Sequence, residues 1–125
     1  MHNLILDSTK YTPSIELNIN GTITITGKSY PENTFAFYAP IMEWIKTFLE
    51  TKEQEILILN MEIIYFNSSS SKLFFDLFDL LDEHNSSVNI NINWIYHKEN
   101  DSAEEAGEDF IEDFDNLNII LVEKE

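Results

Sequence analysis

The segment from Val88 to Tyr96 constrains the fold of this chain more than any other part of its sequence. Apolar and aromatic residues stand at every second position there, and Asn89, Asn91 and Asn93 point to the opposite face. Successive side chains of a β-strand point to opposite faces of the sheet, so the alternation predicts a strand with one buried face. A sheet of this kind needs a covering layer on one side only.

A β-hairpin is expected near the start of the chain. Apolar and polar residues alternate in Ser14–Ile19, which assigns Ile19 to the buried face, and isoleucines alternate with threonines in Thr22–Thr26. Asn20-Gly21 lies between the two segments and suits the positive backbone dihedral angles of a two-residue hairpin turn. Residues 1–11 show no such pattern and are expected to form a leader, a candidate for a flexible segment.

Three segments have the apolar spacing of helices. Asn33 can cap the first helix, which follows a loop predicted over Gly27–Asn33. Pro40 must either start the regular part of that helix or kink it. A second helix starts within the serine run at 68–71, and a short acidic helix is expected over Ala103–Phe114.

Two more strands complete the expected sheet. Glu55–Phe66 carries apolar residues on both faces, with Ile56, Ile58 and Ile64 on one of them, which predicts a central strand with both faces covered. Leu117–Val122 is the last strand. The order is β-β-α-β-α-β-α-β, an α/β fold with a mixed sheet of about five strands and helices mainly on one face. The 125 residues are expected to form a single domain.

Composition excludes several classes of function. The chain has 7 Lys and Arg against 23 Asp and Glu, a formal net charge of −16, so it lacks the basic surface that nucleic acids or anionic membranes require. The charge either serves solubility or steers the chain toward a basic partner. No cysteine, signal peptide or membrane-spanning run is found, so we expect a cytoplasmic protein without membrane insertion.

The serine run at 68–71 is the most suggestive polar feature. It follows the predicted central strand and opens a helix, where free backbone amides and the helix dipole favour an anion. A phosphate on Ser68 would be tolerated at such a position. The alternative is that Ser69 or Ser70 simply caps the helix, and the spacing alone favours this plainer interpretation.

No complete catalytic or metal motif accompanies these serines. Ser69–Lys72 matches a Ser-x-x-Lys pattern, but its companion motifs are absent. A serine could pair with His84 or His97, yet no Gly-x-Ser-x-Gly motif occurs. The acidic segment Glu99–Asp115 has Gly107 in the wrong register for a calcium loop, so a solvated helix is favoured and a docking surface comes second. We expect no enzyme activity, metal or cofactor.

Short motifs run in order over nearly the whole chain. They are Thr12-Pro13, Gly27–Asn33, Glu43-Trp44, Tyr65–Lys72, Trp94–Tyr96 and Ala106–Phe110. Together they resemble the SiaC family of bacterial regulatory phosphoproteins. The resemblance implies a fold similar to the STAS and anti-sigma-factor-antagonist type, a sheet with helices packed on it.

The resemblance also implies a mechanism. Such proteins are phosphorylated by a kinase with a histidine-kinase-like ATPase domain and reset by a PP2C-type phosphatase. The unphosphorylated form binds and activates a diguanylate cyclase, which raises cyclic di-GMP and promotes biofilm formation. The family's phosphorylated residue is a threonine directly after an asparagine, a position that Ser68 holds here after Asn67, with Ser69 as the alternative.

The same motifs imply a set of partner-binding residues at the two loops. These are Tyr30, Glu32, Asn33, Asn67, Ser69, Ser70 and Lys72. A rival hypothesis is a constitutive acidic interaction module that is never phosphorylated.

Overall fold

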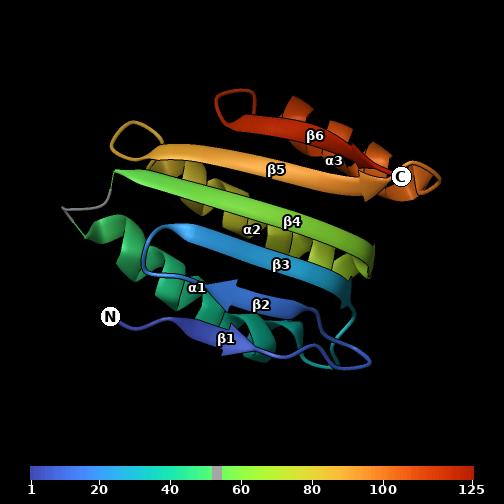
Figure 1. The fold of residues 1–125 in the computed structure, drawn as a ribbon, viewed down its shortest axis with the longest axis horizontal. Coiled ribbons are helices and arrows are strands. Elements are labelled where there is room, and N and C mark those ends of the chain that lie inside the picture. Colours follow the sequence, from blue (N-terminus) through green and yellow to red (C-terminus); the bar gives the residue numbers. More distant parts are fainter. Residues whose placement is uncertain (52–54) are drawn as a thin grey trace.

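A six-stranded mixed sheet and three helices form the computed structural model, which describes residues 1–51 and 55–125 (Figure 1). The strands lie in the sheet in their chain order. The first two pairings are antiparallel and the last three are parallel. The elements are β1 (Leu4–Leu6), β2 (Ser14–Leu17), β3 (Thr22–Ser29), α1 (Thr34–Glu50), β4 (Ile56–Phe66), α2 (Ser68–Glu83), β5 (Asn89–His97), α3 (Asp101–Asp113) and β6 (Asn118–Lys124).

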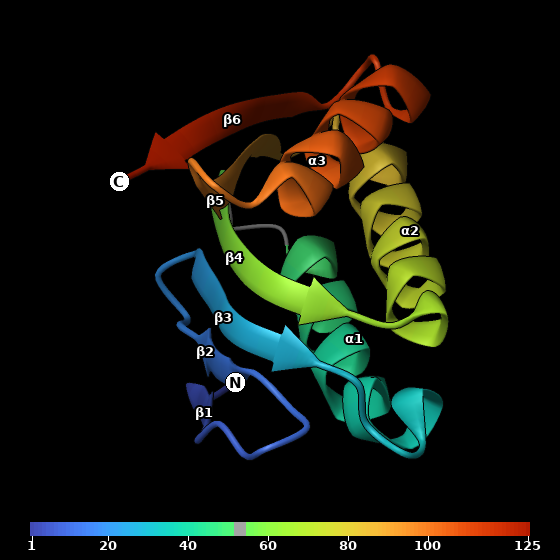
Figure 2. The same cartoon turned by 90° about the vertical axis from the view of Figure 1, so that its right-hand side faces the viewer.

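All three helices cover the same face of the sheet, as Figure 2 shows. The core lies between this face and the helices, and Trp94 of β5 and Phe48, Phe74 and Phe78 of the helices are fully buried there. The predicted α/β fold, with a mixed sheet and helices on one face, is therefore confirmed. Within residues 1–51 and 55–125, no helix is long and apolar enough to cross a membrane.

The sheet has one strand more than the sequence predicted. β1 lies in the segment assigned to a leader and pairs with β2 in the register Leu4↔Leu17 to Leu6↔Ile15. Leu4 and Leu6 are half-buried against the core, whereas Ile5 between them is 65% exposed. A three-residue edge strand offers too short an alternation to be recognised from sequence alone.

β4 is central in the sheet, but the prediction that both its faces are covered is wrong. Leu57, Leu59 and Met61 are buried under the helices, whereas Ile56 and Ile64 on the other face are 50% and 54% exposed. Each connection after β3, β4 and β5 places its helix on the same side, so the opposite face stays open. The apolar residues on both faces of this strand therefore do not indicate a second layer of helices on the open face.

The hairpin of β2 and β3 is confirmed with a wider turn than predicted. Leu17 pairs with Ile23, and the Asn18 amide donates to the carbonyl of Thr22. The loop thus has three residues and ends at Gly21, which has the positive φ that a glycine tolerates at this place (φ 100). Ile19 belongs to this loop and is 46% exposed, not buried as predicted.

β3 extends into the segment predicted as a loop over Gly27–Asn33. Its last residues, Lys28 and Ser29, pair with Tyr65 and Phe66 of β4 beyond a register shift at Gly27. That glycine has φ 128, so a bulge lets the strand continue. Ser29 is thereby carried to the start of α2.

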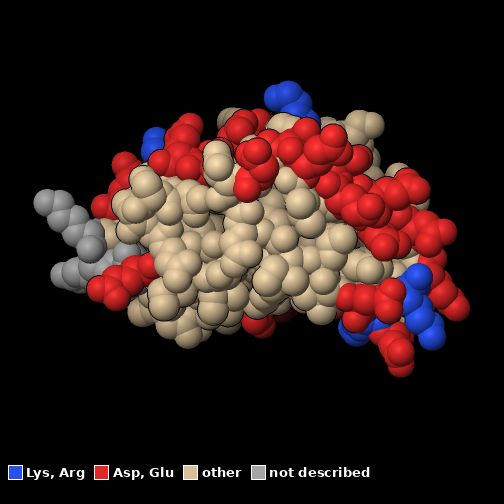
Figure 3. All heavy atoms as spheres, turned by 90° about the horizontal axis from the view of Figure 1, so that it is seen from above, with Lys and Arg blue, Asp and Glu red and all other residues tan. Residues whose placement is uncertain are grey.

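α1 and α3 follow the sequence predictions closely. Asn33 caps α1 as predicted, and Pro40 lies inside the helix and does not start it. The acidic helix is α3, which buries Ala103, Gly107 and Phe110 and turns its carboxylates outward. Figure 3 shows acidic side chains in a band on the side of the molecule that carries α3 and β6.

Candidate functional site

The parallel strands β3, β4 and β5 end at one edge of the sheet, and a helix begins after each of them (Figure 1). Each of these helices is capped by an asparagine. The side chains of Asn33, Asn67 and Asn100 accept hydrogen bonds from backbone amides of the first turns at 3.0, 3.0 and 3.1 Å. The positive ends of three helix dipoles therefore lie along one edge, where ligands of open α/β sheets commonly bind.

The four serines at this edge differ sharply in exposure. Ser68 and Ser69 are exposed and Ser71 is half-buried, whereas Ser70 is fully buried. Asn67, not a serine, is the helix cap, so the plainer sequence interpretation of the run is wrong. The first two serines of the run are therefore the ones that lie at the surface.

Ser70 belongs to a buried chain of hydroxyl groups. Its Oγ donates to the carbonyl of Ser29 at 3.0 Å and lies 2.8 Å from the Oγ of Ser29, which lies 2.6 Å from the Tyr38 hydroxyl. Burial raises the pKa of Tyr38 to about 12, and the hydrogen bond to Ser29 opposes this only in part. These buried hydroxyl groups connect β3, α1 and α2 beneath the exposed serines.

Ser69, one of the exposed pair, lies against the start of α1. The Oγ of Ser69 is 2.7 Å from the Oγ1 of Thr34 and donates to the Asn67 side chain at 3.2 Å. Ser68 precedes it as the first residue of α2. Lys72 follows one turn later, with its side chain 81% exposed and 3.9 Å from Asp76. The beginnings of α1 and α2 therefore meet at Ser69, next to Ser68.

The remaining predicted residues lie in the loop between β3 and α1. Tyr30 is half-buried and packs edge-to-face on Tyr11 and Tyr65, with ring centroids 5.3 and 5.6 Å away. Glu32 and Asn33 are exposed. The structure thus brings most of the predicted residues to one edge, while Ser70 is too deep to touch a partner.

Sequence reasoning missed the residues that hold this edge in place. Ser29 of β3 contacts Ser70, Thr34 of α1 contacts Ser69, and Tyr38 of α1 contacts Ser29. Ser29 lies in a motif that the family resemblance used, and Thr34 directly follows the predicted cap. Their contacts could not be foreseen, because each spans a separation that only the packing of β3, α1 and α2 creates.

The arrangement suits covalent modification better than catalysis. An exposed hydroxyl at a helix N-terminus can carry a phosphate, because free backbone amides and the dipole stabilise the negative charge. His84 lies at the opposite end of α2, with Nδ1 3.1 Å from the carbonyl of Leu80. A helix of 16 residues is about 24 Å long, so His84 cannot act as a base for Ser68.

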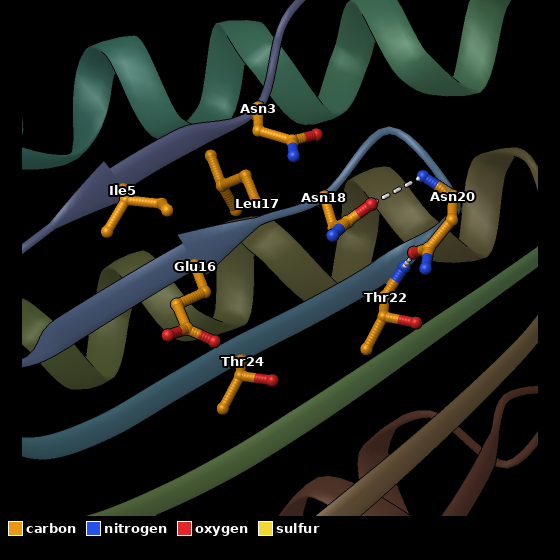
Figure 4. Close-up of a pocket in the computed structure, with 8 residues that line it drawn as sticks. All are labelled: Asn3, Ile5, Glu16, Leu17, Asn18, Asn20, Thr22 and Thr24. Carbon is orange, nitrogen blue, oxygen red and sulfur yellow. Dashed lines mark hydrogen bonds between the residues drawn. The ribbon is translucent and has the colours of Figure 1, made fainter.

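A separate polar depression of about 270 Å³ lies on the helix-free side of β1, β2 and β3 (Figure 4). The side-chain oxygens of its three asparagines accept hydrogen bonds from backbone amides of the hairpin loop. Asn18 accepts from the Asn20 amide, Asn20 from the Thr22 amide, and Asn3 from the Ile19 amide, at 2.9, 2.9 and 2.8 Å. These bonds stabilise the hairpin turn.

The sequence is similar to that of a known family. The family model described as "SiaC family regulatory phosphoprotein" matches residues 6–124 of this chain. An uncharacterized protein of Pseudomonas aeruginosa is 33% identical over 115 residues, which cover 90% of both chains.

Solved structures agree over nearly the full length. The crystal structure of apo-SiaC from Pseudomonas aeruginosa has a TM-score of 0.85 and 27% identity, covering 98% of this chain and 99% of the other. A chain in the crystal structure of the diguanylate cyclase SiaD in complex with its activator SiaC has a TM-score of 0.89 and 29% identity, covering 97% and 99%. With a family match from residue 6 to residue 124, this chain belongs to the SiaC family of regulatory phosphoproteins.

Proposed function

We propose that this chain is a non-catalytic signalling protein of the cytoplasm that binds and activates a diguanylate cyclase while it carries no phosphate. Family membership supports a regulatory role. The structurally similar SiaC of Pseudomonas aeruginosa is described as the activator of the diguanylate cyclase SiaD. The output would be a rise in cyclic di-GMP and, through it, biofilm formation.

We further propose that phosphorylation of Ser68 ends this interaction. The observation that carries this is the exposed position of Ser68, the first residue of α2, directly after the Asn67 cap and next to Ser69, whose Oγ lies 2.7 Å from the Oγ1 of Thr34 at the start of α1. The kinase would contain a histidine-kinase-like ATPase domain, and a PP2C-type phosphatase would remove the phosphate. A phosphate adds roughly −1.5 to −2 charges, which a docked partner would have to desolvate.

The residues proposed to contact partners are the accessible ones at this edge. They are Glu32, Asn33, Ser69 and Lys72, which are exposed, together with Tyr30 and Asn67, which are half-buried. Ser70 is fully buried, so we assign it a structural role in place of the predicted partner contact. A coupling free energy of about 1–3 kcal/mol between phosphorylation and docking would change occupancy about 5–150-fold.

Two Ser68 variants and one control test the switch. Ser68→Ala should bind and activate the cyclase but gain no phosphate from the kinase in intact-mass analysis. Ser68→Asp should lose most of the activation, measured as cyclic di-GMP formed per minute. Ser69→Ala should still be phosphorylated, and it decides between the two exposed serines.

Other results would overturn the switch. Equal activation by Ser68→Ala and Ser68→Asp would support a constitutive interaction module instead. A phosphate that persists on Ser68→Ala and disappears on Ser69→Ala would move the site to Ser69.

A further inference from the structure

The outer surfaces of α1 and α2 leave an open groove between them, with a volume of about 440 Å³. Both helices begin at the same edge of the sheet, so they run in the same direction (Figure 2). On α1 the groove is lined by Phe35, Ala39, Met42 and Lys46, which recur at helical spacing and form one stripe. Phe35 is 78% exposed, a large apolar side chain left to solvent.

α2 supplies a matching stripe. Leu73, Asp76, Leu80 and Glu83 line the other side of the groove, again at helical spacing. The two stripes run for about three turns, or roughly 17 Å. The apolar side chains form most of the groove surface. A third helix packs into such a groove naturally, because its own apolar stripe has the same period.

The charges of the groove select the partner. Glu43, Asp76 and Glu83 line it with one cation, Lys46. Lys72 is 3.9 Å from Asp76 but 81% exposed, so this pair leaves the carboxylate open to a partner. A helix with Lys or Arg beside its apolar stripe is therefore complementary. A second copy of this chain is not, since each copy has a net charge of −16.

The groove begins at the proposed switch. Thr34 precedes Phe35, Ser69 lies one turn before Leu73, and the hydroxyls of Thr34 and Ser69 are 2.7 Å apart at this end. The positive dipole ends of α1 and α2 also lie here. The negative C-terminal end of a partner helix is stabilised at this place, and a phosphate on Ser68 would repel it.

We propose that this groove receives an amphipathic helix of the effector, antiparallel to α1 and α2, with basic residues flanking its apolar stripe. This rests on the proposed function, and it names the surface and the kind of segment that carry the interaction. Phosphorylation then weakens docking at the end of the groove, while the apolar contacts further along remain available.

The test measures binding of a diguanylate cyclase from the same organism by titration calorimetry. Phe35→Ala should weaken binding about 30-fold, the effect expected for a buried aromatic anchor. Ile120→Ala is the matched control, because Ile120 is 50% exposed on the open sheet face. The affinity of this variant for the cyclase should change by less than about threefold. Circular dichroism of each variant checks that the fold is retained.

A charge reversal tests complementarity separately. Glu83→Lys should weaken binding at low salt, with a smaller loss at high salt. Glu105→Lys changes the net charge equally on the exposed surface of α3 and should leave the affinity within a factor of two or three. A photo-crosslinking residue at position 42 should capture a helical segment of the cyclase with flanking Lys or Arg.

The outcomes separate the two proposals. If the unmodified chain binds the cyclase and Phe35→Ala and Glu83→Lys bind equally well, the groove is wrong and the proposed function stands. Crosslinks from position 42 to a second copy, or to a non-helical segment, also overturn the groove. If the unmodified chain binds no cyclase, both proposals fail.

Discussion

At the scale of residues, the serine run divides into side chains with separate tasks. Ser70 lies in the buried hydroxyl chain, Ser69 joins the starts of two helices, and Ser68 is exposed beside them. Ser29 is the centre of the buried chain, since its Oγ contacts the hydroxyls of both Tyr38 and Ser70. The exposed residues of the site are thus held in place by buried side chains that a partner does not contact.

Removal of the central hydroxyl should therefore be costly. Ser29→Ala leaves the hydroxyls of Tyr38 and Ser70 buried without this partner, and we expect a loss of about 1–3 kcal/mol in the free energy of unfolding. Urea unfolding measures it. Ser68→Ala is the matched control, and its exposed position should limit the change to about 0.5 kcal/mol. Equal stability of the two variants would contradict the structural role of the buried chain.

The ionisation of Tyr38 should appear as a loss of stability at high pH. Burial raises its pKa from 10.0 to about 12, so the folded state holds the proton more tightly than the unfolded chain does. This contribution is complete below pH 10 and is lost as the pH rises from 10 to 12, an effect of about 2–3 kcal/mol. Urea unfolding of the wild type and of Tyr38→Phe between pH 9 and 12 measures the difference. Parallel pH profiles of the two proteins would refute it.

At the scale of elements, the packing of α3 on β5 depends on close approach. Gly107 faces the sheet at a place where an added Cβ would lie 2.5 Å from Trp94 and from Leu121. The indole is rigid, and its Nε1 donates to the carbonyl of Ala103 at 2.8 Å. A glycine at this point of a helix lets the helix lie directly on the sheet.

Gly107→Ala should consequently destabilise the protein, although alanine is the better helix former by about 1 kcal/mol. We expect a net loss of about 1–3 kcal/mol from overpacking, seen in urea unfolding together with a changed near-ultraviolet signal of Trp94. Ser102→Ala, at an exposed position of the same helix, is the control and should be neutral or slightly stabilising. A more stable Gly107→Ala protein would show that α3 can move away from the sheet.

Sequence periodicity predicted most helices and strands, but few of the pairings and contacts between them. The alternation of Val88–Tyr96 and the cap at Asn33 were predicted correctly, because both depend on local geometry. The strand at Leu4–Leu6 and the end of β3 at Ser29 were not, since each forms through pairing with a distant neighbour. The exposed position of Ser68 agrees with a modification site, while the contacts beneath it required the packed structure.

At the scale of the whole molecule, the negative charge of the acidic side chains far exceeds the positive charge of Lys and Arg. Salt bridges found in residues 1–51 and 55–125 join Lys72 to Asp76 and Lys124 to Glu62, whereas the chain has 23 acidic residues. Figure 3 shows carboxylates gathered on the side of the molecule that carries α3 and β6. Their mutual repulsion acts against the compact state and weakens as salt is added.

Added salt should therefore raise the thermal stability. Between 10 and 200 mM sodium chloride, the Debye length falls from about 30 Å to below 10 Å, so distant carboxylates cease to interact. We expect the melting temperature to rise by several degrees in a scan followed by circular dichroism. Replacing Glu105 and Glu112, both exposed on α3, by glutamine should shrink the increase. A melting temperature that falls with salt would show that attractive pairs dominate.

The structural contacts of the serine run are made by its other residues and not by the side chain at position 68. Asn67 caps α2 and Ser70 anchors it, and neither contact involves the side chain at position 68. Threonine, or a cysteine bearing a fluorescent dye, can therefore be introduced at 68 at little folding cost. In this otherwise cysteine-free chain, such a dye would be a single spectroscopic handle that reports partner docking in real time.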